Sequence, residues 1–143
     1  MNLSEHFTLS ELTMSERAAR DGLDNTPSST SIENLKRLAA ALEAIRVKLG
    51  RPIVVTSGYR APLVNKAVGG AADSAHVLGL AADINCPGMT PKALALFIKS
   101  SGVKYDQLIL EYDTWVHFGL SCGTLRGQDL TKRTGTPYMA GLL

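Results

Sequence analysis

The chain has few of the residues that most often carry catalysis or bind metals: three histidines and two cysteines among 143 residues. The two cysteines, Cys86 and Cys122, are too few for a disulfide framework and form no CxxC pair. We interpret them as small thiols inside the fold, with a disulfide bridge or a metal role as the alternatives. An excess of one charge is also missing, because the formal net charge is only +2. This balance gives no argument for nucleic acid as a partner.

Long hydrophobic runs are absent as well. No apolar stretch approaches the roughly 20 residues that span a bilayer, and the residues from Met1 to His6 are polar and lack the apolar region of a signal peptide. We therefore expect a protein made in the cytoplasm, without stable membrane association, that something else must deliver to any substrate beyond the membrane. With 45% hydrophobic and 20% charged residues, it is expected to form one domain, residues 1–143, and to be a monomer.

The most regular pattern lies in Ile32–Leu49, where apolar residues recur at helical spacing. Ser31 precedes this stretch as a candidate N-cap. Gly50 ends it and Pro52 prevents its resumption. The pattern predicts a long amphipathic helix after a loop at residues 22–31, which are rich in Ser, Thr, Asn and Pro.

Shorter patterns flank this helix on both sides. Apolar, β-branched runs predict strands, and threonine caps or an early proline predict helices. The expected strands cover residues 53–57, 80–85, 107–111 and 115–120. One short helix is expected after a cap at Thr8 or Ser10, and two more are expected at residues 62–68 and 91–99. After Gly123 the pattern fades, so residues 124–143 are expected to form loop and tail. Helices on one side of a small, mostly antiparallel sheet make an α+β fold.

Two of the three histidines lie in segments with other candidate metal ligands. His76 is followed seven residues later by Asp83, and Gly79 between them permits a sharp turn. Asp83 falls on an apolar strand, where an unpaired carboxylate is costly. A bound metal is one way to satisfy this carboxylate. The alternative is an Asp that caps a turn beside a surface histidine.

His117 lies on the predicted strand Trp115–Leu120, which has no other ionisable residue. Alone, it would be interpreted as a hydrogen-bonded core histidine. Together with His76 and Asp83 it favours a metal site, because each group supplies a partner for the others. Two imidazoles and one carboxylate leave the fourth position of a tetrahedral zinc open for water, as in a catalytic site. The pattern therefore indicates a zinc-dependent hydrolase, and a metal-free domain with coincidental histidines is the alternative.

A zinc hydrolase also needs a base that takes a proton from the attacking water and passes it to the leaving group. Glu111 ends the strand before the predicted hairpin, so the folded hairpin brings it toward His117. Asp113, in the turn, is the second candidate. Arg60 follows a strand and a glycine, where its guanidinium could clamp a carbonyl oxygen or a terminal carboxylate. The alternatives are a solvated hairpin end for Glu111 and a surface ion pair for Arg60.

The candidate residues belong to three motifs in a recognisable order. The motifs are Ser57-Gly58-Tyr59-Arg60, Ser74-x-His76-x-x-Gly79-x-Ala81-x-Asp83 and Trp115-x-His117. This combination resembles the M15 zinc peptidases, which include D-Ala-D-Ala carboxypeptidases and phage L-alanyl-D-glutamate endopeptidases and share their fold with hedgehog signalling domains. The resemblance covers about residues 32–121. Residues 7–12 and 22–25 also look like the single-domain, often phage-encoded, branch.

The resemblance assigns roles to residues that match the family's motifs. It implies zinc ligands at His76, Asp83 and His117, a clamp for the substrate or oxyanion at Arg60, and a hydrogen-bonding group beside the site at Ser74. We also expect Asp113, in the hairpin turn, to contact the substrate.

The chain departs from one branch of the family near its last histidine. Several members carry an acidic residue three positions before that histidine, where this chain has Thr114. Others place a Glu six positions before it, which corresponds to Glu111 here. We therefore choose Glu111 as the base. Some members have a second histidine where this chain has Trp115, whose indole would stack on the substrate or shield the metal.

Taken together, the residues and the resemblance predict hydrolysis of an amide bond in the stem peptide of peptidoglycan. The small net charge does not hinder approach to this anionic polymer. Carboxypeptidase and endopeptidase activity both stay open, because a closed pocket or an open groove depends on loop shape. We expect a phage or prophage lysis enzyme released through membrane holes, or a virion-associated wall-degrading enzyme. The rival hypothesis is a zinc-binding but catalytically silent wall-binding or virion module, which need not retain Glu111.

Overall fold

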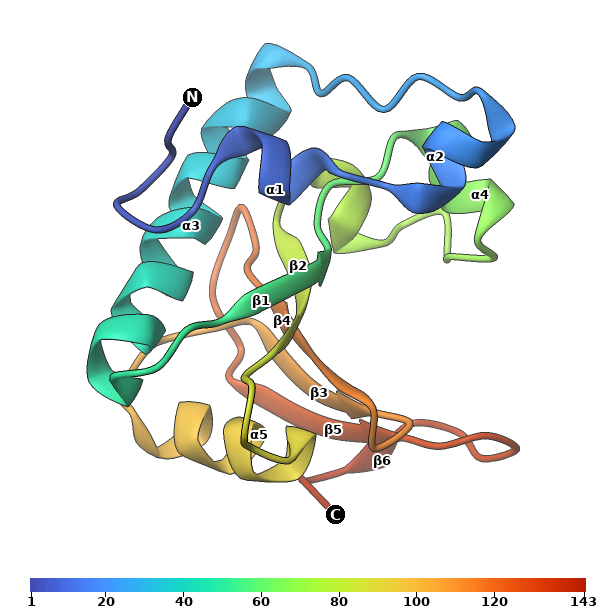
Figure 1. Ribbon diagram of the computed structural model, residues 1–143. Helices are drawn as coiled ribbons and strands as arrows, with labels where there is room; N and C mark the ends of the chain where they lie inside the picture. The colour runs from blue at the N-terminus through green and yellow to red at the C-terminus, as the bar shows by residue number, and fades with distance from the viewer.

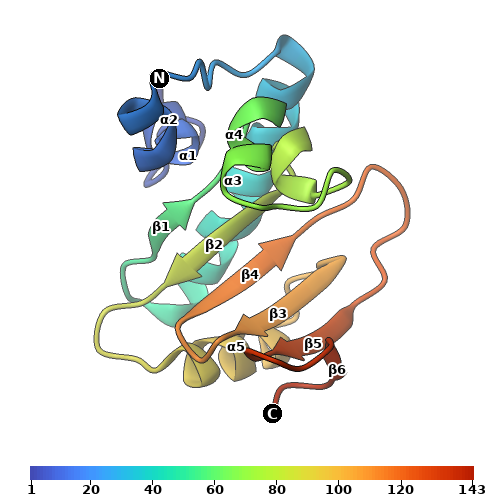
Figure 2. The ribbon, with the colours of Figure 1, turned by 90° about the vertical axis from the view of Figure 1, so that its right-hand side faces the viewer.

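A six-stranded sheet forms the centre of the computed structural model, which describes residues 1–143. The strand order is β1, β2, β4, β3, β5 and β6, as seen face-on in Figure 2. Neighbouring strands are antiparallel except β3 and β5, which are parallel. The strands are β1 (Val54–Ser57), β2 (Ala81–Asn85), β3 (Gln107–Glu111), β4 (Trp115–Gly119), β5 (Gln128–Lys132) and β6 (Met139–Ala140). The predicted α+β fold with a mostly antiparallel sheet is confirmed.

The helices lie on one face of this sheet and at its upper edge in Figure 2. They are α1 (Leu9–Thr13), α2 (Glu16–Asp21), α3 (Ser29–Leu49), α4 (Pro62–Ala67), the 3₁₀ helix η1 (Ala75–Leu78) and α5 (Pro91–Ser100). Helices α3 and α5 lie behind the sheet in Figure 2 and to one side of it in Figure 1. The front face of β4 and β3 is left without a helix, and α4 and η1 lie at its upper edge. No helix is both long enough and apolar enough to cross a membrane.

Alternation along the central strands separates the core from the open face. Ile84 of β2 and Phe118 of β4 belong to the hydrophobic core and are 0% exposed. Their neighbours Asp83 and His117 point to the opposite face, because successive side chains of a strand alternate. Burying side chains of this size stabilises the fold by about 1.5–3 kcal/mol each. The apolar residues therefore hold the strands against α3 and α5, while the polar residues between them stand on the open face.

Helix α3 begins earlier than predicted. Its N-cap is Ser28, whose hydroxyl accepts a hydrogen bond from the backbone N–H of Ser31 at 3.1 Å. The prediction that Ser31 is the cap was wrong, since Ser31 already lies inside the helix and is 8% exposed. The run 28–31 offers a hydroxyl at every position, so the sequence pattern alone did not distinguish among them. Gly50 ends the helix in the left-handed conformation, as predicted (φ 68°).

Replacing Ser28 with Ala is expected to destabilise the protein by about 1 kcal/mol, because one N–H of the first turn of α3 loses its acceptor. The matched control is Ser29→Ala, which removes a hydroxyl from the adjacent exposed position that caps nothing. Denaturant unfolding of both variants measures the difference. Equal free energies of unfolding in the two variants would show that Ser28 is not the cap.

Residues 124–143 were predicted to form loop and tail, and this prediction was wrong. They add β5 and β6 to the sheet, with Leu130 of β5 opposite Ile109 of β3. Asp129 of β5 accepts a hydrogen bond from the Tyr105 hydroxyl and pairs with Lys99 of α5 at 3.1 Å. Strand β5 is short and reads Gln-Asp-Leu-Thr-Lys, which is polar on both faces and carries no alternation that identifies a strand. Tertiary pairing with β3, rather than local propensity, makes it a strand.

Candidate metal centre and cleft

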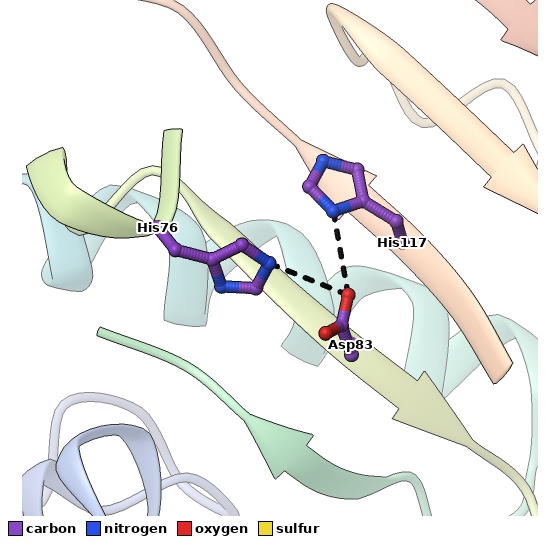
Figure 3. A group of neighbouring side chains, drawn as sticks. All are labelled: His76, Asp83 and His117. Carbon is purple, nitrogen blue, oxygen red and sulfur yellow. Dashed lines mark ion pairs between the residues drawn. The ribbon is translucent and has the colours of Figure 1, made fainter. Parts of the chain in front are cut away.

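The structure brings His76, Asp83 and His117 together on the open face of the sheet. Asp83 of β2 lies directly opposite His117 of β4, and His76 reaches the same point from η1. One carboxylate oxygen, Asp83 Oδ1, lies 3.4 Å from His76 Nε2 and 3.3 Å from His117 Nδ1, and Figure 3 shows both nitrogens directed at it. All three residues are buried. The cross-strand register therefore produces the predicted cluster.

The geometry of this cluster fits a metal ion. Ligands of a tetrahedral zinc with bonds of about 2.0–2.1 Å lie about 3.3–3.4 Å apart, which matches both distances from Asp83 Oδ1. This oxygen is buried and has no hydrogen-bond partner, so it is an acceptor in need of a cation. Burial alone would raise the pKa of Asp83, but the imidazoles of His117 and His76 outweigh it and hold the pKa well below its ordinary value. The carboxylate is therefore ionised.

Hydrogen bonds orient the imidazole of His76. Its Nδ1–H donates to the carbonyl oxygen of Gly58 at 2.7 Å, which leaves the lone pair of Nε2 free on the side of Asp83. The hydroxyl of Ser74 accepts the backbone N–H of His76 and caps η1. Ser74 thus lies beside the cluster, as predicted, and supports the helix that carries His76.

Gly79 closes the turn between His76 and β2, as the sequence suggested. Its φ is +76°, and a Cβ atom there would lie 2.7 Å from the backbone oxygen of Ser31 and 3.1 Å from Leu35 Cγ. Two separate effects therefore require glycine: the left-handed backbone and the close approach of α3. Helix α3 thereby fixes the position of the loop that delivers His76.

The variant Gly79→Ala is expected to lose stability through both effects. Gly102→Ala is the matched control, because Gly102 also has a positive φ (+84°) but a Cβ atom added there would meet no other atom within 4 Å. The control should cost about 1–2 kcal/mol for the left-handed backbone. Gly79→Ala should cost about 1–3 kcal/mol more for the clash with α3. Thermal unfolding of the metal-free proteins measures both, and equal losses would contradict the packing argument.

Glu111 lies beside the metal-binding cluster, at the end of β3. Its Oε1 is 3.7 Å from His117 Nδ1, and its side chain is 16% exposed. Burial, and next the negative charge of Asp83, raise the pKa of this carboxyl, while His117, Arg60 and Trp115 lower it. Trp115 is the cross-strand partner of Glu111, and its buried indole Nε1 approaches without meeting the geometry of a hydrogen bond. Glu111 is therefore held between the cluster and an aromatic ring.

Arg60 follows β1, and its guanidinium forms no ion pair within the protein. The Nε atom of this guanidinium is buried and has no hydrogen-bond partner. Burial lowers the pKa of Arg60, and the carboxylates of Asp83 and Glu111 oppose this effect from nearby. Its backbone N–H donates to the His76 carbonyl at 3.1 Å, and the next residue donates to Asn25 Oδ1 at 2.7 Å. Asn25, which no sequence pattern identified as functional, thus fixes the loop that carries Arg60.

The metal-binding cluster and its neighbours line one cleft of about 1220 Å³, namely His76, Asp83, His117, Glu111, Arg60 and Ser74. Trp115, predicted to contact substrate, lines it, and so do Tyr112 and Tyr138, which the sequence did not indicate. Asp113 does not line this cleft. Its carboxylate is 57% exposed and forms a two-point ion pair with Arg133 at 3.0 and 3.2 Å. The structure therefore brings Asp113 neither to the metal-binding cluster nor to the cleft.

A comparison with known families assigns the chain. The model of the family described as Peptidase M15 matches residues 5–119. This match includes the three residues of the metal-binding cluster, Glu111 and Arg60, and it ends at the last residue of β4. No curated protein matches the sequence. Because the match covers most of the chain, and because the cluster it includes fits a metal, the protein belongs to the M15 family of zinc metallopeptidases.

Proposed function

We propose that this protein is a zinc-dependent peptidase that hydrolyses an amide bond in the stem peptide of peptidoglycan. The observation that carries the proposal is a buried group of two imidazoles and one unpaired carboxylate oxygen, with a second carboxylate 3.7 Å from one imidazole. Three protein ligands leave one position open, which is the arrangement of a catalytic zinc. This arrangement supports the predicted zinc and its three ligands. The family supports the predicted substrate class of the enzyme.

The chain's own residues divide the chemistry among them. His76, Asp83 and His117 would hold zinc, and the chemistry that zinc supplies in such a site is Lewis acidity and a water of pKa about 7. Glu111 takes a proton from the attacking water and passes it to the leaving amine, since it is the one carboxylate beside the cluster that is not a ligand. Arg60, a cation without an ion pair, holds the carbonyl oxygen or a substrate carboxylate.

Of the two activities that the sequence leaves open, we propose the endopeptidase. The residues that line the cleft lie on both sides of His117 along the chain, with Trp115 before it and Ser121 and Arg126 after it. In an endopeptidase the substrate chain occupies such a cleft on both sides of the bond that is cut. A carboxypeptidase would instead need a wall that stops the chain at its terminal carboxylate. We accordingly propose cleavage of an internal amide bond, of the L-Ala-D-Glu type.

The biological setting that we propose is phage lysis, with action on the cell wall after release, or attachment to a virion. It rests on the likeness of residues 7–12 and 22–25 to the phage branch. Both segments hold the loop that carries Arg60. The carbonyl oxygen of Leu12 accepts a hydrogen bond from the backbone N–H of Tyr59 at 2.7 Å, and Asn25 Oδ1 accepts one from the residue after Arg60. Lysis of permeabilised bacteria by the added protein would support this setting.

The test of the proposed function is digestion of purified peptidoglycan by the zinc-loaded protein, with and without a chelator, followed by mass spectrometry of the fragments. Chelator-sensitive release of fragments with new D-Glu amino termini would establish the internal cut. Release of single D-Ala residues would show a carboxypeptidase instead. Intact peptidoglycan together with one bound zinc per chain would favour the silent wall-binding module.

A further inference from the structure

The exposed aromatic side chains of the protein gather at one end of the cleft. Tyr112 is 41% exposed and Tyr138 is 56% exposed, and both line the cleft together with Trp115. The rings of Tyr112 and Trp115 lie 5.4 Å apart. The other aromatic residues are inside the fold or partly covered, namely Phe7, Tyr59, Phe97, Tyr105 and Phe118. We call Tyr112, Trp115 and Tyr138 the aromatic wall.

The aromatic wall is held in place by interactions of the C-terminal strands. The ammonium group of Lys132 lies 5.6 Å from the centre of the Tyr138 ring and hydrogen-bonds to the carbonyl of Thr136. The ion pair between Asp113 and Arg133 joins the β3–β4 turn, which carries Tyr112, to the β5–β6 loop, which carries Tyr138. Two distant segments are therefore fastened together beside the cleft. This fastening gives Asp113 a role that does not involve direct contact with substrate.

The wall offers flat, uncharged surface rather than ionic contacts. The nearby cations Lys132 and Arg133 are both engaged, the one by Tyr138 and Thr136 and the other by Asp113. The hydroxyl groups of Tyr112 and Tyr138 form no hydrogen bond within the protein, in contrast to the hydroxyl of Tyr105. Such a surface suits a neutral ring with polarised C–H groups on its face and hydroxyl or amide groups at its rim. A pyranose sugar has this chemistry, and the negative face of an aromatic ring attracts its C–H groups.

We propose that the aromatic wall binds an N-acetylated sugar of the glycan strand to which the stem peptide is attached, and thereby selects glycan-linked substrate. This inference rests on the proposed function. The neutral sugar would lie at the wall, and Arg60, whose buried Nε has no partner, remains for an oxygen of the peptide. Tyr138 lies beyond residues 5–119, which the family model matches, so this part of the wall belongs to the chain's own C-terminal segment.

The first test uses Trp115, the single tryptophan of the chain, as a fluorescent reporter within the wall. Titration with tri-N-acetylchitotriose is expected to change its emission in a saturable way, in zinc-loaded and in chelator-treated protein alike. Tyr138→Ala should weaken this binding about tenfold, whereas Tyr138→Phe, which keeps the ring, should not. The control Leu63→Ala removes an exposed apolar side chain of α4 outside the cleft and should leave binding unchanged.

The second test measures specificity. Hydrolysis of N-acetylmuramyl-L-alanyl-D-glutamyl peptide is compared with hydrolysis of the same peptide carrying an N-acetyl group in place of the sugar. The ratio of the two kcat/KM values should fall about tenfold in Tyr138→Ala and recover in Tyr138→Phe.

The outcomes separate this inference from the proposed function. Sugar binding that depends on Tyr138, without hydrolysis of either peptide, would support sugar binding by the aromatic wall and contradict the proposed peptidase activity. Hydrolysis of both peptides with equal dependence on Tyr138 would show that the wall binds peptide, and would overturn the inference. Absence of any fluorescence response to the sugar in the wild-type protein would overturn it as well.

Discussion

Replacing Glu111 with Gln is expected to lower kcat about 10²–10⁴-fold, the usual contribution of a positioned acid or base. The amide keeps the size of the side chain but takes up no proton, so the attacking water loses its base and the leaving amine its acid. Zinc should stay bound, because Glu111 is adjacent to the metal-binding cluster and is not one of its three members. Initial rates on purified stem peptide, with zinc content determined on the same sample, measure both effects.

The matched control for this variant is Glu33→Gln. Glu33 lies on α3, is exposed and pairs with Lys36 at 2.8 Å, away from the cleft. Its replacement by the same amide should leave the rate and the zinc content unchanged. A near-normal rate for Glu111→Gln would show that another group moves the proton. Loss of zinc from that variant would mean that Glu111 is a ligand instead of a base.

The second large effect concerns the metal itself. Zinc at 100 times its dissociation constant should stabilise the wild-type protein by about 2.7 kcal/mol and raise its melting temperature by roughly 10 °C. Asp83→Ala should abolish this increase and the activity, because it removes the oxygen that both imidazoles face. The increase is measured against each protein's own zinc-free melting temperature, because Asp83→Ala also removes the contacts of Asp83 with His76 and His117.

His6→Ala is the control for the metal experiment, because His6 is the one histidine outside the cluster. It lies at the surface and pairs with Glu43 at 2.7 Å. This variant should keep the zinc-induced increase in melting temperature. Scanning calorimetry with and without zinc measures all three proteins. A zinc-induced increase that persists in Asp83→Ala would place the metal elsewhere.

The sequence predicted those parts of the fold whose pattern is local. Helical spacing identified α3, threonine caps identified α1 and α5, and β-branched runs identified β1 to β4. The cluster was predictable for a similar reason. The hairpin brings Glu111 of β3 toward His117 of β4. Asp83 lies on the apolar strand β2, where its carboxylate needs a partner, and His117 is opposite it.

Features that depend on tertiary pairing were not predictable in this way. Helix α2 is only 6 residues long and lies in a segment with no strong periodicity. Strand β5 gains its structure from its partner β3, and Tyr138 reaches the cleft only because β5 and β6 return to the sheet. The ion pair of Asp113 likewise could not be predicted, because its partner Arg133 lies in a segment expected to be tail.

X-ray absorption at the zinc edge of the zinc-loaded protein tests the central claim, a catalytic metal site with an open position, most directly. The account predicts one zinc surrounded by nitrogen and oxygen alone, at about 2.0–2.1 Å, with two imidazoles, one carboxylate and one water. Asp83→Ala should eliminate this signal. A sulfur ligand at about 2.3 Å would contradict the account, because Cys122 lines the same cleft and would close the fourth position.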